Sequence, residues 1–167
     1  MKVPLPIDIK PPILYMLVGL PYCGKSTWAL KAPAHLINTD LYIEKMCLVE
    51  NKKYHNIFHK YIKKASEEMD NSLTFFIGNE KSVVIDQTNL TVKSRKKKLD
   101  RFTEKYYKIA IVWQLELVEH IRRKEQRPDK FVPDKVLNRM SLSFEIPTLD
   151  EGFDLIVITN GDILWRK

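Results

Sequence analysis

Residues 19–26 read GLPYCGKS, with two glycines five positions apart and a lysine and a serine directly after the second glycine. The apolar run Ile13–Val18 precedes this segment, and Ser26 opens a stretch that is compatible with a helix. Glycines let the backbone turn sharply, so that several N–H groups can face one point. A strand, this loop and a helix in that order predict a phosphate-binding loop in an α/β domain.

The rest of the chain repeats the same alternation of short apolar runs and amphipathic stretches. We expect strands at Ile13–Val18, His35–Thr39, Val83–Asp86, Ile109–Trp113 and Leu155–Thr159. Apolar residues at helical spacing lie between these runs: Ile57 to Met69, then Val92, Leu99, Phe102 and Tyr106, then Val136 to Phe144. Five fully apolar strands separated by helices predict a five-stranded parallel sheet in a three-layer α/β domain, with helices on both faces.

Size and composition agree with one globular domain. The chain has 167 residues, 44% of them hydrophobic and 29% charged, which argues against a disordered protein. We expect residues 1–12, which hold four prolines, to form an extended arm and residues 13–167 to form a single domain. Two cysteines and the lack of a long apolar run favour a reducing compartment, the cytoplasm or the nucleus, and no membrane attachment.

The positive charge is concentrated in one part of the chain. The net charge is +7, yet residues 91–140 alone hold fifteen lysines and arginines against seven acidic residues. A basic segment beside a neutral remainder suggests an anionic partner such as a nucleic acid, and it is equally typical of a solvated lysine-rich helix. The candidate nucleic-acid-binding residues are Lys93, Arg95, Lys97 and Lys98.

The loop at residues 19–26 predicts how ATP and magnesium are held. We expect the ATP-binding residues to be Gly19, Leu20, Pro21, Tyr22, Cys23, Gly24, Lys25, Ser26 and Thr27. In such loops the lysine reaches the β- and γ-phosphates and the serine hydroxyl ligates Mg²⁺. Asp86 ends an apolar strand, where a carboxylate can hold the metal with its water, or can cap the turn that follows.

Acidic and basic side chains elsewhere indicate the acceptor and the transition-state contacts. Asp40 follows the second expected strand in a segment without arginine, which favours a hydroxyl acceptor with Asp40 as general base. The alternative is that Asp40 is only the N-cap of the next helix. Arg123 and Arg127 lie one helical turn apart in a stretch that can close over the nucleotide, or that simply forms a basic helix end.

The ordered set of these residues resembles the kinase domain of the 5′-hydroxyl polynucleotide kinase family. The resemblance rests on GLPYCGKSTW at 19–28, Asp40, DQTN at 86–89, Arg123 with Arg127, and FEIPTLDEGF at 144–153. It implies an adenylate-kinase-like P-loop fold, ATP and Mg²⁺ as cofactors, and DNA or RNA 5′-hydroxyl ends as substrates.

Two features of this chain depart from the pattern of that family. Ile43 stands where phage members carry an arginine that contacts substrate phosphate, and the chain lacks the D-x-D-x-[TV] motif of the accompanying phosphatase. The loop and DQTNL are also similar to the kinase-like domain of heterogeneous nuclear ribonucleoprotein U. We therefore expect an ATP-dependent polynucleotide 5′-hydroxyl kinase, with a nucleotide-dependent RNA-binding module or a small-molecule alcohol or nucleoside kinase as alternatives.

Overall fold

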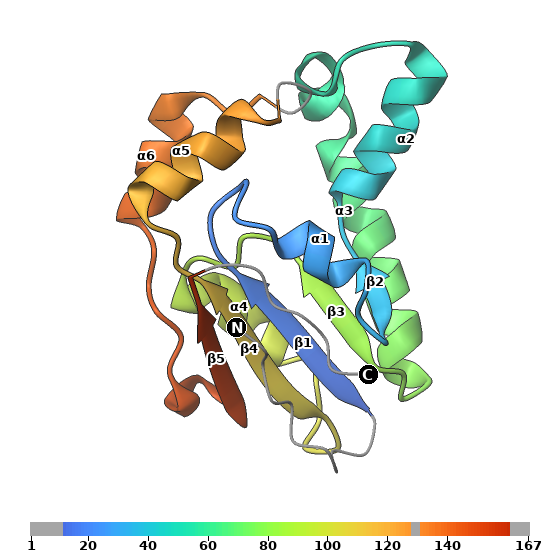
Figure 1. The fold of residues 1–167 in the computed structure, drawn as a ribbon. Helices are drawn as coiled ribbons and strands as arrows, with labels where there is room; N and C mark the ends of the chain where they lie inside the picture. Colours follow the sequence, from blue (N-terminus) through green and yellow to red (C-terminus); the bar gives the residue numbers. More distant parts are fainter. Residues whose placement is uncertain (1–11, 128–130, 161–167) are drawn as a thin grey trace.

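A computed structural model describes residues 12–127 and 131–160 of the chain. It contains a parallel sheet of five strands, β1 (Ile13–Val18), β2 (His35–Ile37), β3 (Val83–Asp86), β4 (Tyr107–Trp113) and β5 (Leu155–Thr159), in the order β2-β3-β1-β4-β5 (Figure 1). The five expected strands and their parallel arrangement are thus confirmed. The second strand is shorter than expected because Thr39 already has helical backbone angles, with φ −77° and ψ −29°.

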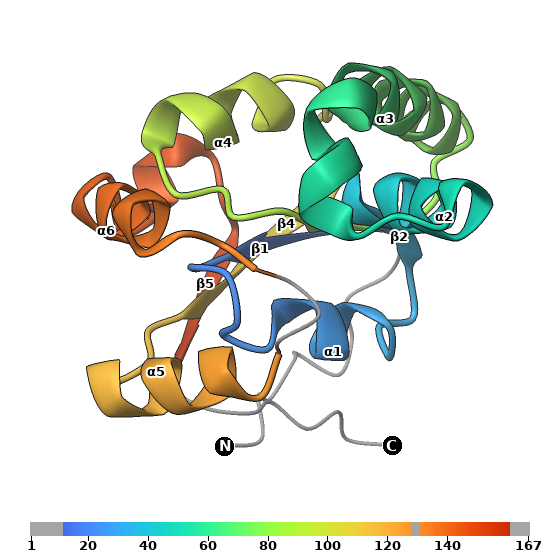
Figure 2. The same cartoon turned by 90° about the horizontal axis from the view of Figure 1, so that it is seen from above.

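The helices cover both faces of the sheet, as predicted. Seen from above in Figure 2, α3 (Tyr54–Gly78), α4 (Val92–Leu99) and α6 (Asp134–Leu142) lie on one side, and α1 (Lys25–Ala29) and α5 (Leu117–Glu125) lie on the other. Alternate residues of β1 point into two separate apolar clusters. Leu14 and Met16 pack toward α3 and α4, whereas Tyr15 and Leu17 pack toward α1.

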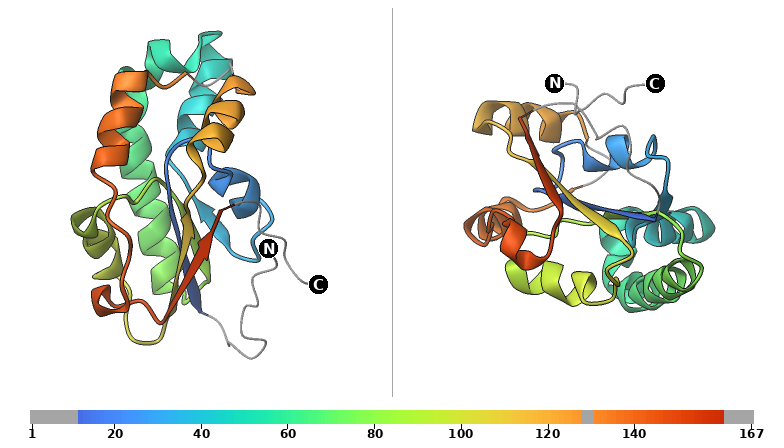
Figure 3. Two further views of the ribbon diagram at one scale, coloured as in Figure 1. Left: turned by 60° about the vertical axis from the view of Figure 1, so that its left-hand side comes forward. Right: turned by 90° about the horizontal axis from the view of Figure 1, so that it is seen from below.

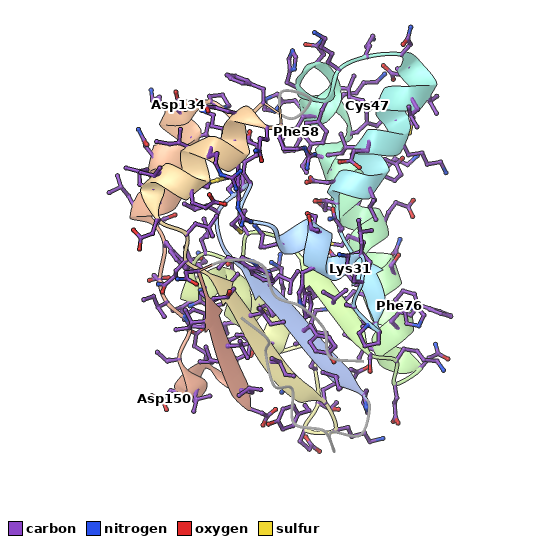
Figure 4. All side chains as sticks on the ribbon, in the orientation of Figure 1. Lys31, Cys47, Phe58, Phe76, Asp134 and Asp150 are labelled. Atoms are coloured by element: carbon purple, nitrogen blue, oxygen red, sulfur yellow. The ribbon has the colours of Figure 1, made fainter. Side chains whose placement is uncertain are left out.

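The long helix α3 joins the sheet to a peripheral helix, α2 (Asp40–Glu50). The second half of α3 packs on the sheet through Leu73, whereas its first half packs on α2 through Ile57 and Ala65. Figure 3 shows α3 running along most of the length of the molecule, and Figure 4 labels Phe58 and Cys47 in this α2–α3 region. The helical stripe predicted between residues 57 and 69 is therefore the face that binds α2 and the sheet.

The apolar residues at helical spacing from Val92 to Tyr106 do not lie on one helix. Helix α4 ends at Leu99, and the Phe102 N–H donates to the Leu99 carbonyl at 2.9 Å, which tightens the chain into a turn. Phe102 and Tyr106 are nevertheless buried in the core, with their rings edge to face at 4.9 Å. The apolar spacing thus identified Leu99, Phe102 and Tyr106 as buried, but it was wrong for Val92, which is 39% exposed, and it did not identify the helix end.

Within the described ranges no helix is long and apolar enough to cross a bilayer. Of the expected N-terminal arm, residues 1–11 lie outside the described residues, and the expected single domain of residues 13–167 remains a prediction.

Candidate active site

The loop between β1 and α1 has the backbone geometry that its glycines predict. Gly19 has φ +154° and Gly24 has φ +105°, and a Cβ atom on Gly19 would lie 2.9 Å from Cys23 Sγ and 3.1 Å from the Trp113 carbonyl oxygen. Only glycine fits at position 19, because a side chain would meet both the loop and β4. Tyr22 also has a positive φ of 68°, so the tip of the loop is tightly wound.

Lys25 is turned back into this loop. Its ammonium nitrogen donates hydrogen bonds to the carbonyl oxygens of Gly19 at 2.9 Å and Leu20 at 2.7 Å, and it lies 3.4 Å from Cys23 Sγ. The side chain is 6% exposed, so these carbonyl dipoles hold a buried cation at the loop. Lys25 is the first residue of α1, and Ser26 and Thr27, which follow it in the helix, are exposed.

The carboxyl ends of β2 and β3 bring two carboxylates close to this loop. Asp86 ends β3 in register with Leu17 of β1, two residues before Gly19. Asn38, directly after β2, donates from Nδ2 to Asp86 Oδ2 at 2.7 Å and accepts at Oδ1 from the Asp40 N–H at 2.5 Å. Asn38 therefore links the predicted metal-holding residue to the predicted base, a bridge that the sequence analysis missed.

Asp40 is the first residue of α2, and Thr39 occupies the N-cap position. The alternative that Asp40 is the N-cap of the helix is thus wrong. A carboxylate in the first turn nevertheless stabilises the helix through its interaction with the helix dipole. One Asp40 carboxylate oxygen accepts a hydrogen bond from the Tyr54 hydroxyl at 2.6 Å. Asp40 is half-buried, so its carboxylate is held by protein groups while remaining within reach of a ligand.

The oxygen donors at this edge fit a magnesium ion. Ser26 and Asp86 supply a hydroxyl and a carboxylate, and Mg²⁺ typically binds one or two carboxylates together with substrate phosphates and water. Asn38 contacts only Oδ2 of the Asp86 carboxylate, which leaves Oδ1 for a metal-bound water. The described part of the chain contains no group of three or more histidine, cysteine or acidic side chains placed to cage a metal.

Helix α5 holds the tip of the phosphate-binding loop from the other side. Arg123 donates from Nη1 to the Cys23 carbonyl at 3.0 Å and from Nε to Glu119 at 2.6 Å. His120 Nε2 lies 2.6 Å from the Pro21 carbonyl oxygen, and because a carbonyl only accepts, Nε2 carries the proton. The structure thus brings Arg123 to the loop, with His120 as a further contact that the sequence analysis did not single out.

Arg127 is exposed and lies beyond α5, which ends at Glu125, so the full helical turn expected between Arg123 and Arg127 is not formed within the helix. It lines a cavity of about 1,000 Å³ between α5, α6 and the loop, together with Leu20, Trp113 and Leu137. Residues 128–130 of the basic stretch lie outside the described residues.

A protein-family model described as an AAA domain matches residues 14–147, which is most of the chain. The chain belongs to this family. Among curated relatives, the bifunctional polynucleotide phosphatase/kinase of Schizosaccharomyces pombe is 30% identical over 145 residues. The match covers 84% of this chain and 31% of that protein, so the chain spans about a third of the relative's length.

Solved structures share the fold of this AAA domain. A putative kinase from Chloroflexus aurantiacus has a TM-score of 0.64 at 16% identity, covering 92% of this chain and 87% of that one. A chain of the Pnkp1/Rnl/Hen1 RNA repair complex has a TM-score of 0.61 at 22% identity, covering 82% and 45%. A toxin–antitoxin protein of Streptococcus pneumoniae (TM-score 0.66, 18% identity) covers 91% of this chain and 68% of that one, so the fold does not identify the acceptor.

The segment after β3 is hydrogen-bonded to the end of β1 and to the first residue of the phosphate-binding loop of this AAA domain. The Gly19 N–H donates to the Thr88 carbonyl at 3.0 Å, and Asn89 Nδ2 donates to the Leu17 carbonyl at 2.7 Å. Asn89 has φ +48°, a conformation that asparagine tolerates better than most residues. The DQTN segment therefore fixes the end of β1, a structural role that its sequence alone did not reveal.

One of the predicted nucleic-acid-binding residues is wrongly placed by the sequence analysis. Arg95 is fully buried, and its guanidinium donates to both carboxylate oxygens of Glu151 and to the carbonyls of Asn89, Leu90 and Glu145. A guanidinium that is fully buried and bonded in this way cannot reach a phosphate outside the protein. Arg95 is a structural residue.

The remaining basic residues of α4 separate into two kinds. Lys98 is partly buried, donates to Asn89 Oδ1, and its pKa is lowered to about 8, chiefly by burial and then by the charge of Lys97. The ammonium group of Lys98 is therefore already bonded to a protein oxygen. Lys93 and Lys97 are exposed, four residues apart on one helix face, and their contact with nucleic acid remains a prediction.

Proposed function

We propose that this AAA domain transfers the γ-phosphoryl group of ATP to the 5′-hydroxyl of DNA or RNA. The observation that carries the proposal is the Asp40–Asn38–Asp86 bridge at the carboxyl ends of β2 and β3, beside the phosphate-binding loop. The bridge joins Asp86 to the main chain of Asp40, which supports a division of roles between a carboxylate that holds the metal and a carboxylate that serves the acceptor. The similarity to a protein named for polynucleotide kinase activity supports a polynucleotide 5′-end as that acceptor.

The roles follow from what each group can do. The loop amides and Lys25 hold the phosphates of ATP, and Ser26 and Asp86 hold Mg²⁺, which supplies charge neutralisation on the β- and γ-phosphates when bound. Asp40 accepts the proton of the 5′-hydroxyl as that oxygen attacks phosphorus. A phosphate acceptor would instead call for cations around a second anion, and the start of α2 offers Asp40 and Ile43.

Arg123 and Arg127 are proposed to stabilise the charge on the transferring phosphoryl group. Arg123 already contacts the loop through the Cys23 carbonyl, so a rotation of its guanidinium exchanges a carbonyl for a phosphate oxygen. Lys93 and Lys97 are proposed to contact the phosphate backbone of the polynucleotide, a contact that is independent of base sequence and sensitive to salt.

The proposal is tested with γ-labelled ATP and three acceptors: a 5′-hydroxyl oligonucleotide, the same oligonucleotide carrying a 5′-phosphate, and a free nucleoside. We expect label on the 5′-hydroxyl oligonucleotide alone. Label on the nucleoside but not on the oligonucleotide would show a small-molecule kinase. Retention of RNA that depends on ATP, without any transfer of label, would show a binding module instead.

A further inference from the structure

A tyrosine hydroxyl contacts the proposed base directly. Tyr54 and Asp40 are the first residues of α3 and α2, and the Tyr54 hydroxyl donates to Asp40 Oδ1 at 2.6 Å. Between them the chain turns through Asn51, which has φ 51° and ψ 45°. This turn and the start of α3 carry Tyr54 to the beginning of α2, fourteen residues away in sequence.

The direction of this hydrogen bond is fixed by its surroundings. A carboxylate only accepts, so the phenol is the donor. Burial, and then the negative charge of Asp40, raise the pKa of Tyr54 above its usual value, so the hydroxyl keeps its proton throughout the neutral range. The Tyr54 ring is steadied by the Phe58 ring, whose centroid lies 5.7 Å away.

The backbone of Asp40 is fixed as well. Its N–H donates to Asn38 Oδ1, so the main chain is tied to β2 and, through Asn38, to Asp86. With the main chain held there, the Asp40 side chain can still turn about its two side-chain torsions, and the Tyr54 hydrogen bond restrains both. A base that is oriented by a further hydrogen-bonding group is a recurring arrangement in active sites.

We propose that Tyr54 is a positioning residue whose hydroxyl holds the Asp40 carboxylate in the orientation that accepts the proton of the acceptor hydroxyl. This inference rests on the proposed function, since it assigns Asp40 the role of base. No proton is transferred by Tyr54 itself: its O–H bond stays intact while Asp40 takes the proton of the attacking alcohol.

The chain offers a matched control for this contact. Tyr61, also on α3, donates its hydroxyl to Glu50, the last residue of α2. Tyr54→Phe and Tyr61→Phe therefore each remove one hydroxyl that ties α3 to an α2 carboxylate, and each keeps the ring. They differ in that only Tyr54 touches Asp40.

We expect Tyr54→Phe to lower kcat by about tenfold to a hundredfold, the loss that follows when a reacting group is slightly misplaced, with the KM for ATP unchanged. Tyr61→Phe should leave kcat within about twofold of wild type. In an Asp40→Asn background, Tyr54→Phe should cause no further loss, because the group that it positions is gone. A kcat for Tyr54→Phe equal to that of Tyr61→Phe, or an equal loss with and without Asp40, would overturn the inference.

A second readout separates this inference from the proposed function. The ¹³C resonance of the Asp40 carboxyl group, assigned with Asp40→Asn, should shift in Tyr54→Phe and stay in place in Tyr61→Phe. If the wild-type protein labels no 5′-hydroxyl oligonucleotide, the proposed function fails, and the kinetic comparison is made on whichever acceptor it does label. If the resonance does not move in Tyr54→Phe, Tyr54 does not hold Asp40, and the inference fails whatever the acceptor.

Discussion

Arg95 and Glu151 form a buried ion pair that joins α4 to the 3₁₀ turn η1 (Leu149–Glu151), with two hydrogen bonds of 2.7 Å each. Their side chains are 0% and 6% exposed. The pair connects positions 56 residues apart and also gathers the carbonyls of the segment that supports the phosphate-binding loop. Arg95, although it belongs to the most basic part of the chain, thus connects distant segments in the protein interior.

Replacing Arg95 should therefore destabilise the fold. Arg95→Met leaves the Glu151 carboxylate buried without its partner, so we expect the free energy of unfolding to fall by about 3–5 kcal/mol in urea denaturation. The control is Arg101→Met, which breaks the more exposed pair with Asp70 and should cost at most about 1 kcal/mol. Equal losses in the two variants would show that burial of Arg95 does not set the size of the effect.

Asp40→Asn tests the base. The substitution keeps the size of the side chain and its place in the first turn of α2, so ATP affinity measured by calorimetry should stay close to wild type. Turnover of a 5′-hydroxyl oligonucleotide should fall by about 10²–10⁴, the usual contribution of a general base. Turnover near the wild-type rate would show that Asp40 is not the base and only stabilises the start of α2.

Lys93→Glu with Lys97→Glu tests the exposed face of α4. Each lost phosphate contact removes roughly 0.7–0.9 from the slope of log affinity against log salt concentration, so the slope of oligonucleotide binding should become shallower. Lys63→Glu with Lys64→Glu, on an exposed part of α3, makes the same change of net charge and should leave the slope unaltered. If both pairs change the slope alike, the effect comes from net charge rather than from a binding face.

Lys98 predicts a dependence of stability on pH. Its pKa is about 8 in the folded protein against an ordinary value of 10.5, so between these values the unfolded chain binds more protons than the folded one. The contribution of Lys98 to the free energy of unfolding should consequently rise as the pH is raised from about 8 to about 10.5. Urea denaturation at pH 7 and pH 10 checks this, because Lys98→Met should remove the rise; an identical pH dependence in both proteins would contradict it.

The features that the sequence predicted are those encoded locally. The loop at 19–26 is defined by its own glycines. Each strand coincides with a short apolar run, so the sheet and its helical layers could be predicted from the spacing of apolar residues. The carboxylates Asp40 and Asp86 could be placed at the same edge because parallel strands end together.

What the sequence did not predict depends on contacts between distant segments. The partner of Arg95 is 56 residues away, and within a run of basic residues nothing marks the one that turns inward. Asn38 and Tyr54 are ordinary residue types whose importance appears only when the strand ends and helix starts are brought together. The contact of His120 with the Pro21 carbonyl could likewise not be predicted, because it depends on how α5 packs against the loop.

The contact between α5 and the loop determines which way the N–H groups of the loop point. His120 and Arg123 grip the main-chain oxygens of Pro21 and Cys23, not their side chains. In a trans peptide the oxygen and the following N–H point in opposite directions, so pulling these two oxygens toward α5 turns the N–H groups of Tyr22 and Gly24 away from it. The hydrogen-bonding groups of this contact come from the side chains of α5, so a substitution at His120 or Arg123 removes one of them and changes the tilt of the peptide planes that face the nucleotide.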